Sequence, residues 1–141
     1  MKNLLKKFRE NKKGFTLAEL LVVVAIVGIL VAISIPVFTA QLGKARLATN
    51  NANLRAAKAA AVSEYLTGDK NDGQSDNYEY TVSTGDITAD GVTIPTDLDE
   101  LVINGDKVSN KTVYETVYVA ISGTTTDGKV SDDISVKLYA K

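Results

Sequence analysis

An uninterrupted apolar run dominates this sequence of 141 residues. From Leu20 to Phe38 (LLVVVAIVGILVAISIPVF) the only polar residue is Ser34. As an α-helix the run would span about 28 Å, close to the roughly 30 Å thickness of the hydrocarbon layer of a bilayer. A helix on the core of a soluble protein shows polar residues every three or four positions, and this run does not. The run therefore predicts a membrane-spanning helix.

The charges are distributed in a way that orients this span. Residues 1–14 carry six basic side chains against Glu10, a net charge of +5, whereas the rest of the chain carries ten basic and sixteen acidic side chains, a net charge of −6. The positive-inside rule keeps the basic end in the cytoplasm and places the C-terminal part outside. Because only the N-terminal tip is basic, no folded basic face for direct binding to nucleic acid is predicted.

Two residue types are missing from the sequence. The absence of Cys excludes disulfides, thiolate metal sites and Cys nucleophiles, and the absence of His removes the usual general base and the commonest metal ligand. An acidic loop at 69–76 resembles an EF-hand loop only loosely, because Gly73 comes one position too early. We therefore predict a protein that is not an enzyme and has no cofactor and no metal site.

The helical pattern continues beyond the apolar run, from Thr39 to Leu66, with many Ala and no Pro. Two apolar rows recur at helical spacing, so more than one face of this half is open to packing. One row contains small residues between two Leu, and the other contains larger side chains: Leu42, Ala45, Thr49, Ala52, Ala56, Ala59 and Leu66 in the first, and Leu47, Leu54, Ala61 and Tyr65 in the second.

After Gly68 the sequence becomes polar and then β-prone. Four short strands are predicted, at Tyr78–Ser83, Val92–Ile94, Val113–Ser122 and Ile134–Tyr139. The segment 123–129 contains an Asp-Gly pair and predicts a hairpin connection between the last two strands. Thr96 and Asp99 predict the cap of a short helix over PTDLDELV.

The last two predicted strands alternate polar and apolar residues, which indicates a half-buried antiparallel pair. We expect their apolar side chains to face the helix: Val117, Val119, Ile121, Ile134, Val136 and Leu138. Residues 67–141 are few for an independent core, and packing on the helix would solve that problem. The predicted fold class is α+β, a long N-terminal helix packed on a small antiparallel sheet. The predicted parts are 1–14, a basic leader; 15–38, a membrane half; 39–66, an amphipathic half; and 67–141, a globular head.

The junction before the apolar run does not fit an ordinary signal peptide, in which a small-residue cleavage site follows an apolar stretch of about 7–15 residues. Here the notable motif precedes the apolar stretch: it is KKGFTLAEL, residues 12–20. From Lys12 to about Phe38 the sequence resembles the type IV pilin family, whose precursors carry a class III signal peptide. The resemblance implies the pilin fold and a short basic leader that is removed.

The resemblance assigns roles to three residues at the junction. Gly14 matches the residue before the bond that a membrane-bound aspartic prepilin peptidase cuts. Phe15 matches the new N-terminus, which the same enzyme methylates on its nitrogen. Thr16 matches the common second residue of mature pilins and is grouped with the assembly residues.

Glu19 is the one acidic residue in the apolar segment. A carboxylate costs about 2.5–3.5 kcal/mol at the middle of a membrane helix and less near the interface. In the family the matching Glu faces the N-terminal ammonium of a neighbouring subunit or of its own chain, and that ammonium exists only after Gly14 is removed. The alternative is an interfacial acid that the membrane tolerates.

Gly28 and Pro36 also match the family pattern. Pro36 lacks an N–H group and its ring crowds the carbonyl of Ala32, while Gly28 adds backbone freedom. The resemblance implies that residues 28–36 lose helical hydrogen bonds in the filament. The alternative is ordinary packing with a mild kink.

The resemblance implies a structural subunit of a type IV pilus, used for adhesion, surface motility, biofilm formation or DNA uptake. The implied partners are further copies of the chain, the prepilin peptidase, a membrane assembly platform with its ATPase, and membrane lipid before assembly. The implied location is the cytoplasmic membrane, with the leader in the cytoplasm, and then the cell surface.

Three alternatives remain at this point. A pseudopilin of a type II secretion or competence system shares the same N-terminus. A signal-anchored extracellular binding module would never be cut after Gly14, and a secreted enzyme would be released by cleavage near Ala40. Many pilins close a C-terminal loop with a disulfide, and this chain departs from that pattern because it has no Cys.

Overall fold

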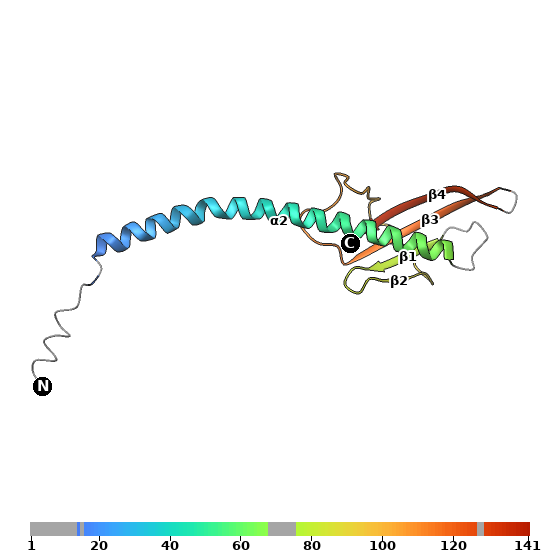
Figure 1. Ribbon diagram of the computed structural model, residues 1–141, viewed down its shortest axis with the longest axis horizontal. Coiled ribbons are helices and arrows are strands. Elements are labelled where there is room, and N and C mark those ends of the chain that lie inside the picture. The colour runs from blue at the N-terminus through green and yellow to red at the C-terminus, as the bar shows by residue number, and fades with distance from the viewer. Residues whose placement is uncertain (1–13, 15, 68–75, 127–128) are drawn as a thin grey trace, which may run out of the picture. The chain divides into compact units, whose positions relative to one another are not determined.

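The computed structural model describes residue 14 and residues 16–67, 76–126 and 129–141, with the backbone alone over 124–126 and 129–133 (Figure 1). One long helix precedes four strands: α2 (Leu17–Thr67), β1 (Asp76–Thr81), β2 (Asp86–Thr88), β3 (Thr116–Thr126) and β4 (Lys129–Ala140). The chain divides into two compact units, Met1–Gln41 and Leu42–Lys141. The boundary between the units falls within the continuous helix α2.

The first unit contains the apolar half of α2. Every residue from Leu17 to Gln41 is exposed, and each large apolar side chain between Leu17 and Phe38 is at least 50% exposed. Among the described residues, α2 is the one helix long and apolar enough to cross a membrane, with a mean hydropathy of 3.1 over its most apolar stretch. An apolar surface of this extent requires a cover of lipid or protein.

The helix continues through Pro36 without a break. Pro36 cannot donate to the carbonyl of Ala32, so one helical hydrogen bond is missing at this point. Two hydroxyl groups bond to the backbone nearby: Ser34 Oγ donates to Leu30 O at 2.6 Å, and Thr39 Oγ1 donates to Pro36 O at 3.0 Å. The loss of helical bonding that we expect at residues 28–36 concerns the filament, and it stays a prediction.

In the second unit, the row of larger side chains on α2 forms the buried face. Leu54, Ala57 and Ala61 are fully buried, Tyr65 is nearly so, and Leu47 packs against them. The row of small residues that includes Ala52 remains exposed. We expected that both rows could be covered. Within a single chain only the row of larger side chains is covered. The larger side chains bury more apolar area, and this determines which row faces the sheet.

The sheet is antiparallel, with the strand order β2-β1-β3-β4 (Figure 1). Val119 pairs with Leu138 and Ile121 pairs with Val136 across β3 and β4. Val119 and Ile121 are fully buried, Leu138 is 5% exposed, and Val136 packs against the same core. The predicted antiparallel pair is confirmed, and so are the faces of its apolar side chains.

The strands of this hairpin are displaced from the predicted positions. β3 begins at Thr116 rather than Val113 and continues to Thr126, while β4 begins at Lys129 rather than Ile134. Thr126 pairs with Lys129, so the connection is shorter than 123–129, and its Asp-Gly pair lies outside the described residues. β3 is longer than predicted because its β-branched Thr residues favour an extended backbone. The pairing of β3 with β4 is irregular between Gly123 and Thr125, where Gly123 has no side chain to pack.

Two predicted elements are wrong. Val92–Ile94 is not a strand, and PTDLDELV is not a helix. The second segment instead makes a turn, in which Leu98 N–H donates to Pro95 O at 3.4 Å. Leu101 then forms a bridge to Leu138, so tertiary pairing overrides the local capping signal.

Strand β2 was not predicted. It follows a turn closed by Gly85 N–H, which donates to Thr81 O at 2.8 Å. Gly85 has a φ of +76°, a conformation that suits glycine, and the turn places β2 against β1. With only three residues, β2 is too short to show an alternating pattern.

The loop of residues 102–114, called here the pinned loop, is held to α2 by polar side chains. Asn50 is fully buried, and its amide Nδ2 donates to the carbonyls of Ser109 and Thr112, both at 2.8 Å. Its Oδ1 accepts from Tyr114 N–H at 2.9 Å. A buried amide with three partners satisfies three polar backbone groups of the loop at once.

Further helix side chains extend this attachment. Asn51 Oδ1 accepts from Asn104 N–H at 2.6 Å, and Arg46 Nη1 donates to Lys111 O at 2.7 Å. Arg55 Nη2 donates to Asn104 Oδ1 at 3.1 Å. Most of these contacts from α2 involve the main chain of the pinned loop, while Val108 and Tyr114 of the loop are buried in the core.

Candidate functional site

The polar end of α2 is the candidate site. Thr16 precedes the first helical residue, and its Oγ1 accepts from Glu19 N–H at 3.2 Å. In return, Glu19 Oε2 accepts from Thr16 N–H at 2.8 Å. This reciprocal pair is a capping box, which satisfies two of the free N–H groups at the start of a helix.

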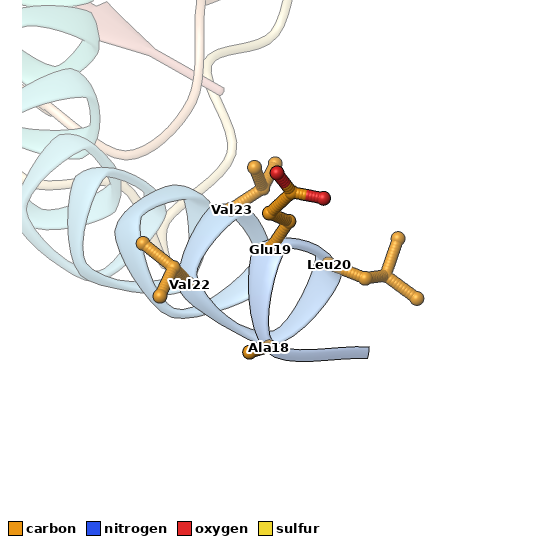
Figure 2. A pocket seen from close by; sticks show the side chains of 5 residues that line it. All are labelled: Ala18, Glu19, Leu20, Val22 and Val23. Carbon is orange, nitrogen blue, oxygen red and sulfur yellow. The ribbon is translucent and has the colours of Figure 1, made fainter. Parts of the chain in front are cut away.

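The surroundings of the Glu19 carboxylate are apolar. Figure 2 shows the carboxylate pointing outward beside Val23, while Ala18, Leu20 and Val22 point to other sides of the helix. In the sequence, Glu19 is the only charged residue between Lys13 and Lys44. Because the positive end of the helix dipole lies at its N-terminus, a carboxylate here is stabilised by position as well as by hydrogen bonds.

The other predicted site residues are placed as follows. Gly14 is exposed, and a Cβ added there would meet nothing within 4 Å. Gly28 lies within α2 and has the same open surroundings, and Pro36 lies within the helix as well. Phe15 lies outside the described residues. The structure thus brings Thr16 and Glu19 into contact and leaves Gly28 and Pro36 on the exposed helix further along.

The described residues contain no group of three or more His, Cys, Asp or Glu side chains that could hold a metal ion. The acidic loop considered for calcium comprises residues 69–76; residues 69–75 lie outside the described residues, and Asp76 begins β1.

Among the described residues of the second unit, Tyr78 has a strongly altered pKa. Tyr78 is 2% exposed, and burial raises the pKa of its phenol to about 12. The negative charges of Asp76 and Glu64 and the neighbouring Tyr65 add to this rise in pKa. The phenol therefore stays neutral in the folded protein well above the pH at which a free tyrosine ionises.

Sequence reasoning missed two features. The pair T-x-x-E at residues 16–19 has the spacing of a capping box, and this signal was available. The burial of Asn50 and Asn51 was not expected, because Asn residues lie off the apolar rows. Nothing in the sequence indicates that these side chains form hydrogen bonds with the backbone of a loop about sixty residues away.

These features define a class: α+β proteins that carry an apolar, membrane-anchoring helix with one polar end. Residues 9–35 match the family described as the prokaryotic N-terminal methylation motif. The chain is also similar to the fimbrial protein EcpC of Eikenella corrodens, with 32% identity over 145 residues that cover 94% of this chain and 88% of EcpC. No solved structure is significantly similar. The chain belongs to the type IV pilin family.

Members of this family are structural subunits of surface filaments rather than enzymes, and this chain is a pilin-like filament subunit with a methylation motif. Its apolar N-terminal helix fits a membrane-anchored precursor and a surface fimbrial filament.

Proposed function

We propose that this chain is made as a precursor, cut between Gly14 and Phe15 by a prepilin peptidase, and methylated on the Phe15 amine. The processed chain then polymerises into a type IV pilus that serves adhesion, surface motility, biofilm formation or DNA uptake. A membrane assembly platform and its ATPase supply the work of extraction from the cytoplasmic membrane.

One observation carries this proposal. Between Leu17 and Phe38, α2 exposes fifteen large apolar side chains, and a lone carboxylate, that of Glu19, lies in the first turn of the helix. Lipid covers such a surface before assembly, and the helices of other copies cover it afterwards, so one surface serves both states. The methylation motif and the similarity to a fimbrial protein support this interpretation.

The proposed parts of the chain have different fates. Residues 1–14 remain in the cytoplasm and are removed, and residues 15–38 pass from the membrane to the core of the filament. Residues 39–66 carry the sheet on the buried face of the helix, and residues 67–141 cover the outside of the filament.

Glu19 pairs with the ammonium group that cleavage creates at Phe15, either in the neighbouring copy or in its own chain. A buried ion pair specifies register more reliably than it adds stability, so this pair sets the axial position of each subunit. Processing and assembly are thereby coupled through one charge.

The test is the intact mass of protein sheared from the cell surface. A mature chain that begins at Phe15 and carries one methyl group is expected. Gly14→Val should leave an uncut precursor in the membrane, because the side chain is too large for the peptidase site. Normal filaments from this variant would contradict the proposal.

A second measurement addresses Glu19. In Glu19→Ala, insertion and cleavage should persist, because the change removes a polar cost and lies five residues beyond the cut bond. The ratio of sheared filaments to processed subunit should fall sharply. An unchanged ratio would show that Glu19 is only an interfacial acid.

A further inference from the structure

The pinned loop contains the one Asn-Gly pair of the sequence, Asn104 followed by Gly105. An Asn that precedes glycine is the arrangement most prone to spontaneous deamidation, because the main-chain nitrogen of a residue without a side chain can approach the amide carbon of the Asn. Asn104 is exposed, and together with Gly105 and Asp106 it lines a cleft of about 290 Å³ between the loop and α2. Water therefore has access to the pair.

The turn at residues 102–105 requires both members of this pair. Gly105 N–H donates to Val102 O at 2.7 Å and closes the turn. Asn104, at the third position of the turn, has a φ of +63°, a conformation that Asn tolerates better than most residues. A Cβ on Gly105 would come within 2.8 Å of Val102 O. The fold thus keeps a reactive pair because the turn needs these two residues.

The reaction at such a pair needs water and no enzyme. The main-chain nitrogen of Gly105 loses its proton and attacks Cγ of Asn104. The N–Cγ bond forms, the Cγ–Nδ2 bond breaks, and the leaving NH2 group takes up a proton and departs as ammonia. Water then opens the five-membered imide at one of its two carbonyl carbons. The product at position 104 is an aspartate or an isoaspartate, and no oxidation or reduction takes place.

The contacts of the pair oppose this attack. Gly105 N–H is bonded to Val102 O, so its nitrogen cannot give up the proton while the turn is closed. Asn51 Oδ1 accepts from Asn104 N–H at 2.6 Å, and Arg55 Nη2 donates to Asn104 Oδ1 at 3.1 Å. These two bonds to α2 hold the main chain and the side chain of the same residue. A guanidinium also polarises the carbonyl that it bonds, but this cannot promote the attack until the turn opens.

We infer that Asn104 is a site of spontaneous deamidation, and that release of the pinned loop from α2 sets the rate of the reaction. Local opening of a loop exposes groups that the closed state protects. An isoaspartate adds one methylene group to the main chain, so the turn closed by Gly105 cannot form again at its original length. A transient release of the loop thereby becomes permanent.

The first test compares the full chain in detergent micelles with a synthetic peptide of residues 99–110, which is the unfolded reference. Intact mass detects the replacement of an NH2 group by OH, and peptide mapping locates it at Asn104. We expect the full chain to react at least about tenfold more slowly than the peptide, because the closed loop is protected. Equal rates in the chain and the peptide would overturn the inference.

Asn51→Ala removes the acceptor of the Asn104 N–H. We expect it to accelerate deamidation roughly three- to tenfold, the effect of one net hydrogen bond. Asn53→Ala is the matched control and should leave the rate unchanged, because Asn53 lies on the same helix and its Nδ2 has no partner among the described residues. An unchanged rate in Asn51→Ala, or an equal rise in both variants, would overturn the inference.

A second measurement needs no variant. In low concentrations of guanidinium chloride, hydrogen exchange of the Gly105 amide and deamidation of Asn104 should accelerate in parallel, since both require the bond to Val102 O to break. A deamidation rate that stays constant while the exchange accelerates would show that release of the loop does not control the reaction, and would overturn the inference.

Discussion

Glu19 combines two properties that a single substitution can separate. It accepts a hydrogen bond from Thr16, as an uncharged amide also could, and it carries the only charge between Lys13 and Lys44. The first property belongs to the single chain, and the second is proposed to act between subunits. The nature of the side chain at this residue therefore determines which step of assembly is affected.

Glu19→Gln should be processed normally but should form few filaments. A Gln at this position of a capping box still accepts the Thr16 N–H, while the ammonium of Phe15 loses its counter-charge. We expect the ratio of sheared filaments to processed subunit to fall at least about tenfold, since breaking a buried ion pair is strongly destabilising. Glu19→Asp, which keeps the charge, is the matched control, and full filament yield from Glu19→Gln would show that charge is not required.

Tyr78 makes the stability of the second unit depend on alkaline pH. Its pKa is about 12 in the folded chain against 10.0 for a free phenol. A raised pKa contributes stability that is fully present below pH 10 and is lost as the pH rises toward 12. The loss amounts to at most about 3 kcal/mol, since one pKa unit corresponds to roughly 1.4 kcal/mol.

The alkaline effect is measured by chemical unfolding of the full chain in detergent between pH 9 and 12. Tyr78→Phe removes the titration, so its free energy of unfolding should fall less over this range than that of the unmodified chain. Identical pH profiles for the two proteins would rule out Tyr78 as the cause.

At the scale of elements, the pinned loop depends on one helical amide. Asn50 bonds three main-chain groups of this loop and is fully buried, whereas Asn53, on the same helix, has a buried Nδ2 without a hydrogen-bond partner among the described residues. The two Asn residues thus form a matched pair, one satisfied and one not.

Asn50→Ala should lower the free energy of unfolding by about 3 kcal/mol, because it leaves buried polar groups of the loop unsatisfied. Asn53→Ala should change it by less than about 0.5 kcal/mol or stabilise the chain, since it removes an unsatisfied amide and adds a better helix former. Thermal and chemical unfolding of the two variants provide the measurement. Similar losses for both would show that the bonds of Asn50 are not the cause.

Local patterns in the sequence predicted the parts of the fold that depend on local chemistry. The apolar run predicted the first half of α2, and the alternation of β3 and β4 predicted their pairing and buried faces. The KKGFTLAEL junction likewise indicated the family.

The rest depends on contacts between distant segments. The residues of PTDLDELV carry a capping signal, but they form a turn at Pro95–Leu98 that is followed by the pairing of Leu101 with Leu138. The burial of Asn50 depends on a loop about sixty residues away, and the helical periodicity of the sequence cannot predict this contact. At the candidate site, the spacing of Thr16 and Glu19 would have sufficed to predict their bonds.

At the scale of the whole molecule, the two compact units have different needs. The first unit requires lipid or other subunits to cover its apolar surface, whereas the second has its own buried core of residues from α2 and the sheet. Residues 15–141 carry a net charge of −6, which favours solubility.

A fragment of residues 42–141 should therefore fold without the apolar half. Its core residues all lie within the second unit, so we expect a monomer with a cooperative thermal transition. Circular dichroism and gel filtration provide the measurement. Asn50→Ala in the same fragment should lower the transition temperature, and a fragment without any cooperative transition would show that the first unit is needed for folding.

The attachment of the pinned loop also has a consequence for how far its surface can vary. Asp106, Lys107 and Asn110 are exposed. Because the loop is held by main-chain bonds to α2 and by the buried Val108 and Tyr114, these three residues can be exchanged with little effect on its position. Gly105 is an exception, because a Cβ there would come within 2.8 Å of Val102 O. Substitutions at these exposed residues can thus change the chemistry of the loop surface while the buried bonds of Asn50 beneath it stay the same.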